Sequence, residues 1–159
     1  MRTGIGFDIH PLVEGRKLAL GGVQIDYERG LDGHSDADVL IHAVIDALLG
    51  AAALGDIGRH FPDSDPQYKD ISGIALLERI QAILNDNGVT IENIDATVIC
   101  EKPRLADHIE HMRDNMAGAL SIETPRVSVK ASTTNGLGII AKGEGIAALA
   151  VALVRKDIT

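Results

Sequence analysis

The chain has 159 residues and a mass of 16.8 kDa, which is the size of one domain with its own hydrophobic core. Hydrophobic residues make up 45% and charged residues 24% of the sequence, so disordered, collagen-like and disulfide-rich classes are excluded. The net charge of −8 and the 3% content of aromatic residues argue against a nucleic-acid-binding protein, which needs cationic and stacking side chains.

Membrane-spanning and targeting segments are not apparent in the sequence. The longest nearly apolar runs, 47–54 and 146–154, fall short of the roughly 20 residues that a membrane-spanning helix needs. Polar residues occupy the N-terminal segment where a signal peptide would be apolar. The single cysteine, Cys100, fits a reducing compartment. We therefore expect a cytoplasmic protein without membrane contact.

The hydropathy pattern predicts an alternation of strands and helices. In chain order it predicts a strand at Arg2–Ile9, a hairpin of Lys17–Leu20 and Val23–Tyr27, a helix from a capping box at Ser35–Asp38 to about Leu54, a loop over 55–70, a helix from about Ser72 to Asn87, a strand over Thr90–Glu101, a helix from Pro103 to about Leu120, and a strand over Arg126–Ser132. The last segment, 145–155, is compatible with either a helix or a buried strand. This order predicts one α/β domain over residues 1–159, with helices packed on a sheet in an α+β sandwich.

A metal site is suggested near the N-terminus. Asp8 and His10 point to one face of the predicted strand, because strand side chains alternate with a period of two. His42 lies in the first predicted helix between Asp38 and Asp46, one of which would orient its imidazole. Together Asp8, His10 and His42 would make a three-ligand site with an open position, as in catalytic zinc centres. Otherwise His10 ends a turn before a proline and His42 is an ordinary surface histidine.

Two further segments have the composition of anion-binding sites. Gly33-His34-Ser35-Asp36 lies at a helix N-terminus, where free N–H groups and His34 would bind an anion, unless Ser35 simply caps the helix. Residues 130–139 place three consecutive hydroxyls at a strand end before two glycines, which suits phosphate. The loop at 55–65 is either a lid over a site or a solvated connection, and Cys100 fits the core better than a nucleophilic role.

Taken together, the motifs F-D-I-H, G-H-S-D-A-D-V-L-I-H-A, A-A-L-G-D-I-G-x-x-F-P-D-S-D-P, K-A-S-T-T and G-E-G-I-A closely resemble the 2-C-methyl-D-erythritol 2,4-cyclodiphosphate synthases of the non-mevalonate isoprenoid pathway. The resemblance extends over essentially the whole chain. It implies a homotrimer of α/β subunits, each with a four-stranded mixed sheet faced by helices, and active sites between subunits. It also implies that segment 145–155 is a strand near the three-fold axis.

The resemblance implies a specific reaction. In this family the 2-phosphate of 4-CDP-2-C-methyl-D-erythritol 2-phosphate attacks the β-phosphorus within the same molecule, which releases CMP and the cyclic diphosphate. Because no water is consumed, the enzyme is a phosphorus–oxygen lyase. By this resemblance Asp8, His10 and His42 hold Zn²⁺ or another divalent transition metal, and Mg²⁺ or Mn²⁺ binds at the substrate diphosphate. His34 and Thr133 are the implied catalytic residues, with Thr133 supplied by the neighbouring subunit.

The implied substrate-binding residues come from four stretches of the chain. Phosphate is expected at His34 and Ser35, beside Asp8, Ile9 and His10, which also contact the substrate. Methylerythritol is expected at Asp56, Ile57, Gly58, Phe61, Pro62, Asp63, Ser64 and Asp65, and cytosine at Cys100, Glu101, Lys102, Pro103, Arg104, Leu105 and Ala106. The diphosphate is expected at Ser132, Thr133, Thr134 and Asn135, with Ile139 and Lys142 as further substrate-binding residues.

This chain departs from the family pattern in the last stretch. Asn135 and Gly136 replace a Glu-Lys pair, Ile139 replaces an aromatic residue, and Lys142 stands where arginine is common. The missing glutamate is a ligand of the family's second metal, and the neutral oxygen of Asn135 is a weaker ligand for a hard cation. Two other functions are compatible with the residues: a metal-dependent phosphohydrolase with an activated water, and a non-catalytic trimeric binding module.

Overall fold

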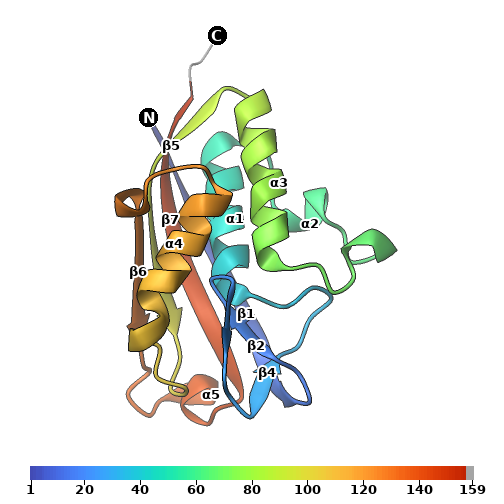
Figure 1. Ribbon diagram of the computed structural model, residues 1–159, viewed down its shortest axis with the longest axis vertical. Helices are drawn as coiled ribbons and strands as arrows, with labels where there is room; N and C mark the ends of the chain where they lie inside the picture. The colour runs from blue at the N-terminus through green and yellow to red at the C-terminus, as the bar shows by residue number, and fades with distance from the viewer. Residues whose placement is uncertain (157–159) are drawn as a thin grey trace.

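The computed structural model describes residues 1–156, and its first and last strands lie side by side in the middle of one sheet (Figure 1). In chain order its elements are β1 (Arg2–Glu14), β2 (Leu18–Leu20), β3 (Val23–Ile25), β4 (Arg29–Leu31), α1 (Val39–Ala52), α2 (Ile57–His60), α3 (Gly73–Asp86), β5 (Val89–Ile99), α4 (Ile109–Ala119), β6 (Val127–Ser132), α5 (Gly138–Ala141) and β7 (Gly145–Lys156).

The main sheet is mixed and has the strand order β4-β1-β7-β5-β6. Only β5 and β6 are parallel; the other three pairings are antiparallel, and β2 and β3 form a separate hairpin. The predicted α/β class and the hairpin are confirmed, and the ambiguous C-terminal segment is the strand β7. The expectation of four strands is wrong by one. The extra strand, β4, has only three residues with no alternating pattern, so periodicity does not reveal it.

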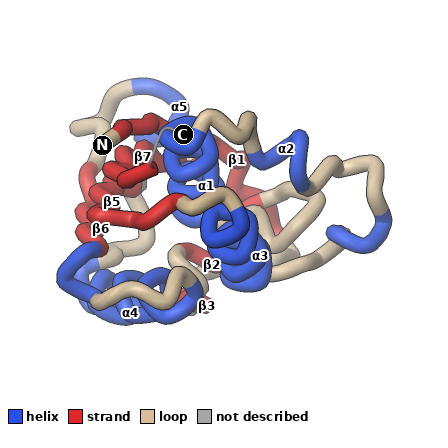
Figure 2. The backbone as a smooth tube through the Cα atoms, turned by 90° about the horizontal axis from the view of Figure 1, so that it is seen from above, coloured by secondary structure: helices blue, strands red, loops and turns tan. Residues whose placement is uncertain are grey.

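The three long helices α1, α3 and α4 lie on one side of the sheet (Figure 2). Helix α1 packs directly on β1 and β7, α3 packs on α1 and β5, and α4 packs on α3 and β6. The core between these layers is aliphatic, and its largest fully buried side chains are leucines and isoleucines. Among residues 1–156, no helix combines the length and the apolar character needed to cross a bilayer.

Several predicted boundaries are corrected. Asp38, not Ser35, caps α1, because Ala37 adopts a left-handed φ of 56° that keeps the preceding turn out of the helix. Helix α4 begins at Ile109 instead of Pro103, since the buried Leu105 holds this connection as a loop before a short 3₁₀ turn. The segment 55–70 contains the single-turn helix α2 and a 3₁₀ turn within its loop.

Candidate metal centre and substrate site

Close packing of α1 against β1 brings the three predicted metal ligands together. Gly4 and Gly6 face the helix, and a Cβ atom at either would collide with the backbone of α1. Asp8 and His10 continue the same face of β1, because side chains alternate along a strand. His42 lies on α1 beside them. Because Gly4 and Gly6 have no side chains, α1 can approach β1 closely enough to place His42 against Asp8 and His10.

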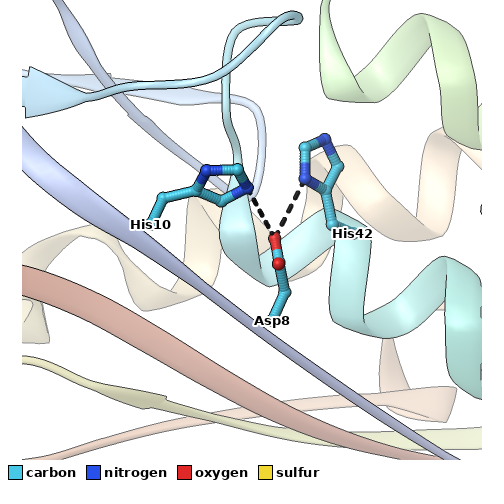
Figure 3. Close-up of side chains that lie close together, drawn as sticks. All are labelled: Asp8, His10 and His42. Atoms are coloured by element: carbon cyan, nitrogen blue, oxygen red, sulfur yellow. Dashed lines mark hydrogen bonds and ion pairs between the residues drawn. The ribbon is translucent and has the colours of Figure 1, made fainter. Parts of the chain in front are cut away.

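The three side chains converge on one carboxylate oxygen (Figure 3). Asp8 Oδ2 lies 3.0 Å from His10 Nε2 and 3.0 Å from His42 Nδ1. All three ligand atoms lie within 4.8 Å of one another. Ligand atoms around a tetrahedral zinc ion are about 3.3 Å apart. The separations and the one-carboxylate, two-imidazole donor set thus fit a divalent transition metal, and the predicted grouping is confirmed.

Each histidine is oriented through its second ring nitrogen. His10 Nδ1 is 2.7 Å from the Asp32 carbonyl oxygen, and His42 Nε2 is 3.2 Å from Ser35 Oγ. An Nδ1–H donor on His10 leaves its Nε2 lone pair free, while an Nε2–H donor on His42 leaves its Nδ1 free. These are the two nitrogens that face Asp8, as expected of metal-binding histidines with fixed tautomers.

The predicted orienting carboxylates have other roles. Asp38 is fully buried and accepts hydrogen bonds from the backbone N–H groups of Gly21, Gly22 and Ile41. Asp46 accepts from the N–H of Ile57 and so ties α2 to α1. The prediction that one of them orients His42 is wrong. Periodicity places Asp38 and Asp46 near His42 but cannot show that backbone donors compete for their oxygens.

The ion pairs in the cluster shift the pKa values of its members. Burial alone would raise the pKa of Asp8, but hydrogen bonds and charge from His10 and His42 outweigh it and hold the pKa well below its usual range. The hydrogen bond to Asp8 raises the pKa of His10 in spite of its partial burial. The metal-free cluster therefore keeps a carboxylate and attracts a proton, which a bound metal ion would displace.

The metal ligands open into a cavity of about 440 Å³. Many of the predicted phosphate and methylerythritol residues lie in its wall, namely Asp8, His10, His34, Ser35, Ile57, Gly58, Phe61, Pro62 and Asp63. His34 Nε2 is buried and has no hydrogen-bond partner among the described residues. A buried imidazole nitrogen without a partner is costly unless a ligand completes it. A polar ligand bound next to the metal ligands would complete this nitrogen.

Most of the predicted cytosine segment forms a second, smaller cavity of about 200 Å³. It is lined by Cys100, Glu101, Pro103, Arg104, Leu105, Ala106, Ala131, Ser132 and Thr133. Glu101 accepts hydrogen bonds from Thr134 N and Oγ1 at 2.8 and 2.9 Å, and these bonds lower the pKa of Glu101. Burial raises the pKa of Cys100 to about 11, which fits the predicted core role. The two cavities have no lining residue in common.

The other predicted residues lie around these cavities without lining them. Asp56 and Asp65 cap short helical turns, Ser64 lies in the same exposed loop, and Lys102 is exposed beside the smaller cavity. Ile9 is 38% exposed and lies on the opposite face of β1 from Asp8. Thr134, Asn135, Ile139 and Lys142 follow β6 around α5, where Ile139 is 52% exposed.

Some residues of the site were not predicted. Tyr68, Ile71 and Leu76 line the metal cavity, and Asp32 orients His10 through its backbone carbonyl. The first three come from the end of the 55–70 loop and from α3, and their apolar character gives no signal that separates them from core residues. A backbone carbonyl carries no side-chain signal at all, so sequence reasoning has no means of finding the role of Asp32.

Comparison with known proteins gives one consistent result. A protein of Pelotomaculum thermopropionicum named 2-C-methyl-D-erythritol 2,4-cyclodiphosphate synthase is 61% identical over 156 residues, which cover 98% of this chain and 96% of that one. A solved structure of a bifunctional IspDF from Campylobacter jejuni is 42% identical with a TM-score of 0.93; the match covers 98% of this chain and 42% of that longer chain.

A second solved structure, a 2C-methyl-D-erythritol-2,4-cyclodiphosphate synthase in a CDP-bound form, is 32% identical with a TM-score of 0.88 and covers 97% of this chain and 100% of that chain. The family model described as YgbB family matches residues 1–155. The resemblance predicted from the sequence motifs is thus confirmed, and the chain belongs to the YgbB family.

Proposed function

We propose that the chain is a phosphorus–oxygen lyase that converts 4-CDP-2-C-methyl-D-erythritol 2-phosphate into 2-C-methyl-D-erythritol 2,4-cyclodiphosphate and CMP, a step of isoprenoid precursor synthesis. The observation that carries the proposal is the Asp8, His10 and His42 cluster at the wall of a cavity, in a chain whose close relatives carry this enzyme name. We place the enzyme in the cytoplasm, which its single cysteine supports.

The chemistry is an intramolecular phosphoryl transfer. An oxygen of the 2-phosphate forms a bond to the β-phosphorus, the bond from the β-phosphorus to the oxygen bridging the α- and β-phosphates breaks, and CMP leaves with that oxygen. Catalysis then consists mainly of aligning two mutually repelling phosphates and neutralising their charge. A Zn²⁺ ion held by Asp8, His10 and His42 supplies positive charge and a Lewis-acid site for a phosphate oxygen when bound.

His34 and Ser35 bind the phosphate next to the metal ligands. The buried Nε2 atom of His34, which has no partner among the described residues, donates a hydrogen bond to a phosphate oxygen and so stabilises charge in the transition state. The loop of Asp56–Gly58 and Phe61–Asp65 encloses the methylerythritol carbons and limits the access of water. Asp63 accepts hydrogen bonds from the hydroxyl groups of the methylerythritol.

The nucleotide half of the site comes from another subunit. The segment Cys100–Ala106 reads cytosine through backbone groups, and Thr133 binds the diphosphate from the end of β6. In one chain these residues surround a cavity separate from the metal cavity. A homotrimer with active sites between subunits would place the two cavities against each other, one from each neighbour.

An uncovered apolar surface supports this assembly. Ile5, Phe7 and Ile9 of β1 and Leu149 and Val151 of β7 are 38–71% exposed, and the register pairs Ile5 with Val151 and Phe7 with Leu149. They lie on the face of the sheet opposite α1. A contiguous apolar patch of this kind is typical of an interface, and we assign it to the centre of the trimer.

The second cation, Mg²⁺ or Mn²⁺, fits this chain less well than Zn²⁺. The stretch 132–139 contains no acidic residue. The oxygen of Asn135 is neutral and lies 3.4 Å from Thr133 Oγ1, while the nearby Glu101 carboxylate accepts from Thr134. Hard cations prefer charged oxygen ligands. We therefore assign this cation to the phosphates of the substrate.

Phosphorus NMR of the zinc-loaded protein with 4-CDP-2-C-methyl-D-erythritol 2-phosphate and Mg²⁺ tests the proposal. We expect CMP and the cyclic diphosphate in equal amounts, and neither product with Asp8→Ala. Free phosphate or an open-chain diphosphate would show that water is the nucleophile and would establish a phosphohydrolase. No turnover by a protein that binds zinc stoichiometrically would leave a binding module.

A further inference from the structure

One short segment, residues 32–35, contacts the second ring nitrogen of both histidine ligands. Its first residue, Asp32, provides the backbone carbonyl that lies 2.7 Å from His10 Nδ1, and its last residue, Ser35, provides the hydroxyl that lies 3.2 Å from His42 Nε2. His34, which faces the metal cavity, lies between them. Any shift of this segment would therefore turn both imidazole ligands and move His34 in the same event.

A single guanidinium holds this segment from the side away from the metal. Arg16 lies in the turn between β1 and β2. Its Nη1 donates to the Gly33 carbonyl oxygen at 3.1 Å and its Nη2 donates to the Ser35 carbonyl oxygen at 2.8 Å. The same Nη1 lies 3.5 Å from the carboxylate of Asp32. The two acceptor carbonyls flank His34, so the fork fixes the backbone direction of that residue.

The opposite edge of the segment is fixed by backbone groups. Asp70 N donates to the His34 carbonyl oxygen at 3.0 Å, and Asp36 N donates to the Ile71 carbonyl oxygen at 3.1 Å. The segment is thus clamped between the connection that precedes α3 and one arginine side chain. The arginine edge depends on one side chain, which a point substitution can remove.

Arg16 lines a different cavity from the one that the metal ligands line. Arg16 lines a space of about 950 Å³ between the β2–β3 hairpin, α3 and α4, whereas the metal ligands line the 440 Å³ cavity. Ser35 lines both, so it is part of the wall between them. Arg16 is absent from the wall of the metal cavity, and its side chain remains 29% exposed.

We propose that Arg16 is a positioning residue that presets the metal centre, because its guanidinium holds the 32–35 segment and thereby fixes His10, His34 and His42. The part of this proposal that concerns turnover rests on the proposed cyclodiphosphate synthase function; the part that concerns metal affinity does not. The planar fork suits this geometry, because it donates to the two carbonyls from two separate nitrogen atoms held in one plane, whereas lysine offers a single, freely rotating ammonium nitrogen.

Arg16→Lys and Arg16→Ala test the proposal, with Zn²⁺ affinity measured by competition against a chromophoric chelator. Altered partners of metal ligands typically reduce metal affinity 10- to 100-fold, and we expect a loss of about 10-fold for Arg16→Lys and towards 100-fold for Arg16→Ala. The d–d absorption of the Co²⁺-substituted protein should also change with each variant, since it reports ligand geometry.

Arg113 offers a matched control. Its guanidinium also joins two backbone carbonyls, those of Val127 and Thr124, but between α4 and β6. Arg113→Lys and Arg113→Ala should reduce stability by a similar amount and leave Zn²⁺ affinity and the Co²⁺ spectrum unchanged. Zinc affinity within threefold of the unmodified protein in both Arg16 variants, or an equal loss in the Arg113 variants, would overturn the proposal.

Chemical rescue separates positioning from general damage. Because Arg16 lines an open cavity, millimolar guanidinium should enter the space left in Arg16→Ala and restore part of the zinc affinity and turnover, but should not restore Ser35→Ala. Absence of rescue together with unaltered zinc binding in Arg16→Lys would refute the role. If the unmodified protein makes no cyclic diphosphate, the proposed function fails, while the zinc and cobalt measurements still decide the role of Arg16.

Discussion

Replacement of Ser35 by alanine should weaken metal binding without unfolding the protein. Ser35 Oγ accepts a hydrogen bond from Ala37 N at 3.1 Å and lies 3.2 Å from His42 Nε2. Loss of the bond to Ala37 should cost about 1 kcal/mol of unfolding free energy. Loss of the bond to His42 frees the imidazole to rotate, for which a 10- to 100-fold decrease in zinc affinity is expected, or about 1.4–2.7 kcal/mol.

Ser72→Ala is the matched control for this experiment. Ser72 caps α3 with a bond of 3.2 Å from Ala75 N, so the same atom is removed at a similar cost in stability, but no metal ligand is touched. Zinc affinity would be measured by chelator competition, and unfolding free energy by urea titration of the chelated protein. Zinc affinity of Ser35→Ala within threefold of the unmodified protein, or an equal loss of affinity in Ser72→Ala, would show that Ser35 does not orient His42.

Three other predictions follow from packing and burial. Gly6→Ala should lose about 2–3 kcal/mol of unfolding free energy and weaken zinc binding, because its Cβ would collide with the Ala43 carbonyl and displace α1 from β1. The control Gly118→Ala, at a position with open space around it, should gain about 0.5–1 kcal/mol. Equal urea unfolding curves for the two variants would contradict the predicted collision at Gly6. Asp38→Ala removes the acceptor of three backbone bonds and should lose about 3 kcal/mol in urea unfolding; a loss below 1 kcal/mol would be inconsistent with its burial. With a pKa of about 11, Cys100 should react with iodoacetamide at pH 8 roughly 100-fold more slowly in the folded than in the urea-unfolded chain, and its rate should rise up to about pH 11; similar rates in both states would show that the thiol is accessible and ionised.

The metal ligands could be predicted because each signal is local. Asp8 and His10 are two residues apart on a strand, and His42 interrupts an apolar helix, so residue type and period suffice to mark all three. The contacts that orient them are not local. The carbonyl of Asp32 and the guanidinium of Arg16 act through backbone geometry, which no side-chain pattern encodes.

The errors in the predicted fold also arise from contacts that are not local in sequence. The three residues of β4 are too few for periodicity to register, and Pro103 has the signal of a helix start although Leu105 is drawn into the core first. Segment 145–155 is ambiguous in the sequence because its alanines favour a helix, whereas its length and its valines allow the buried strand that it forms between β1 and β5. In each case tertiary packing decides between local preferences of similar strength.

The two faces of strand β1 have different roles, and this constrains the length of the strand more than its composition. Gly4, Gly6, Asp8 and His10 turn towards α1, while Ile5, Phe7 and Ile9 turn away from it. A point substitution disturbs one of these faces. Deletion or insertion of a single residue between Gly6 and Asp8 would exchange them, sending the carboxylate and imidazole to the outer surface and apolar groups beneath the helix. Among homologues, substitutions in this strand should therefore be tolerated at several positions, whereas changes in its residue count should be eliminated by selection.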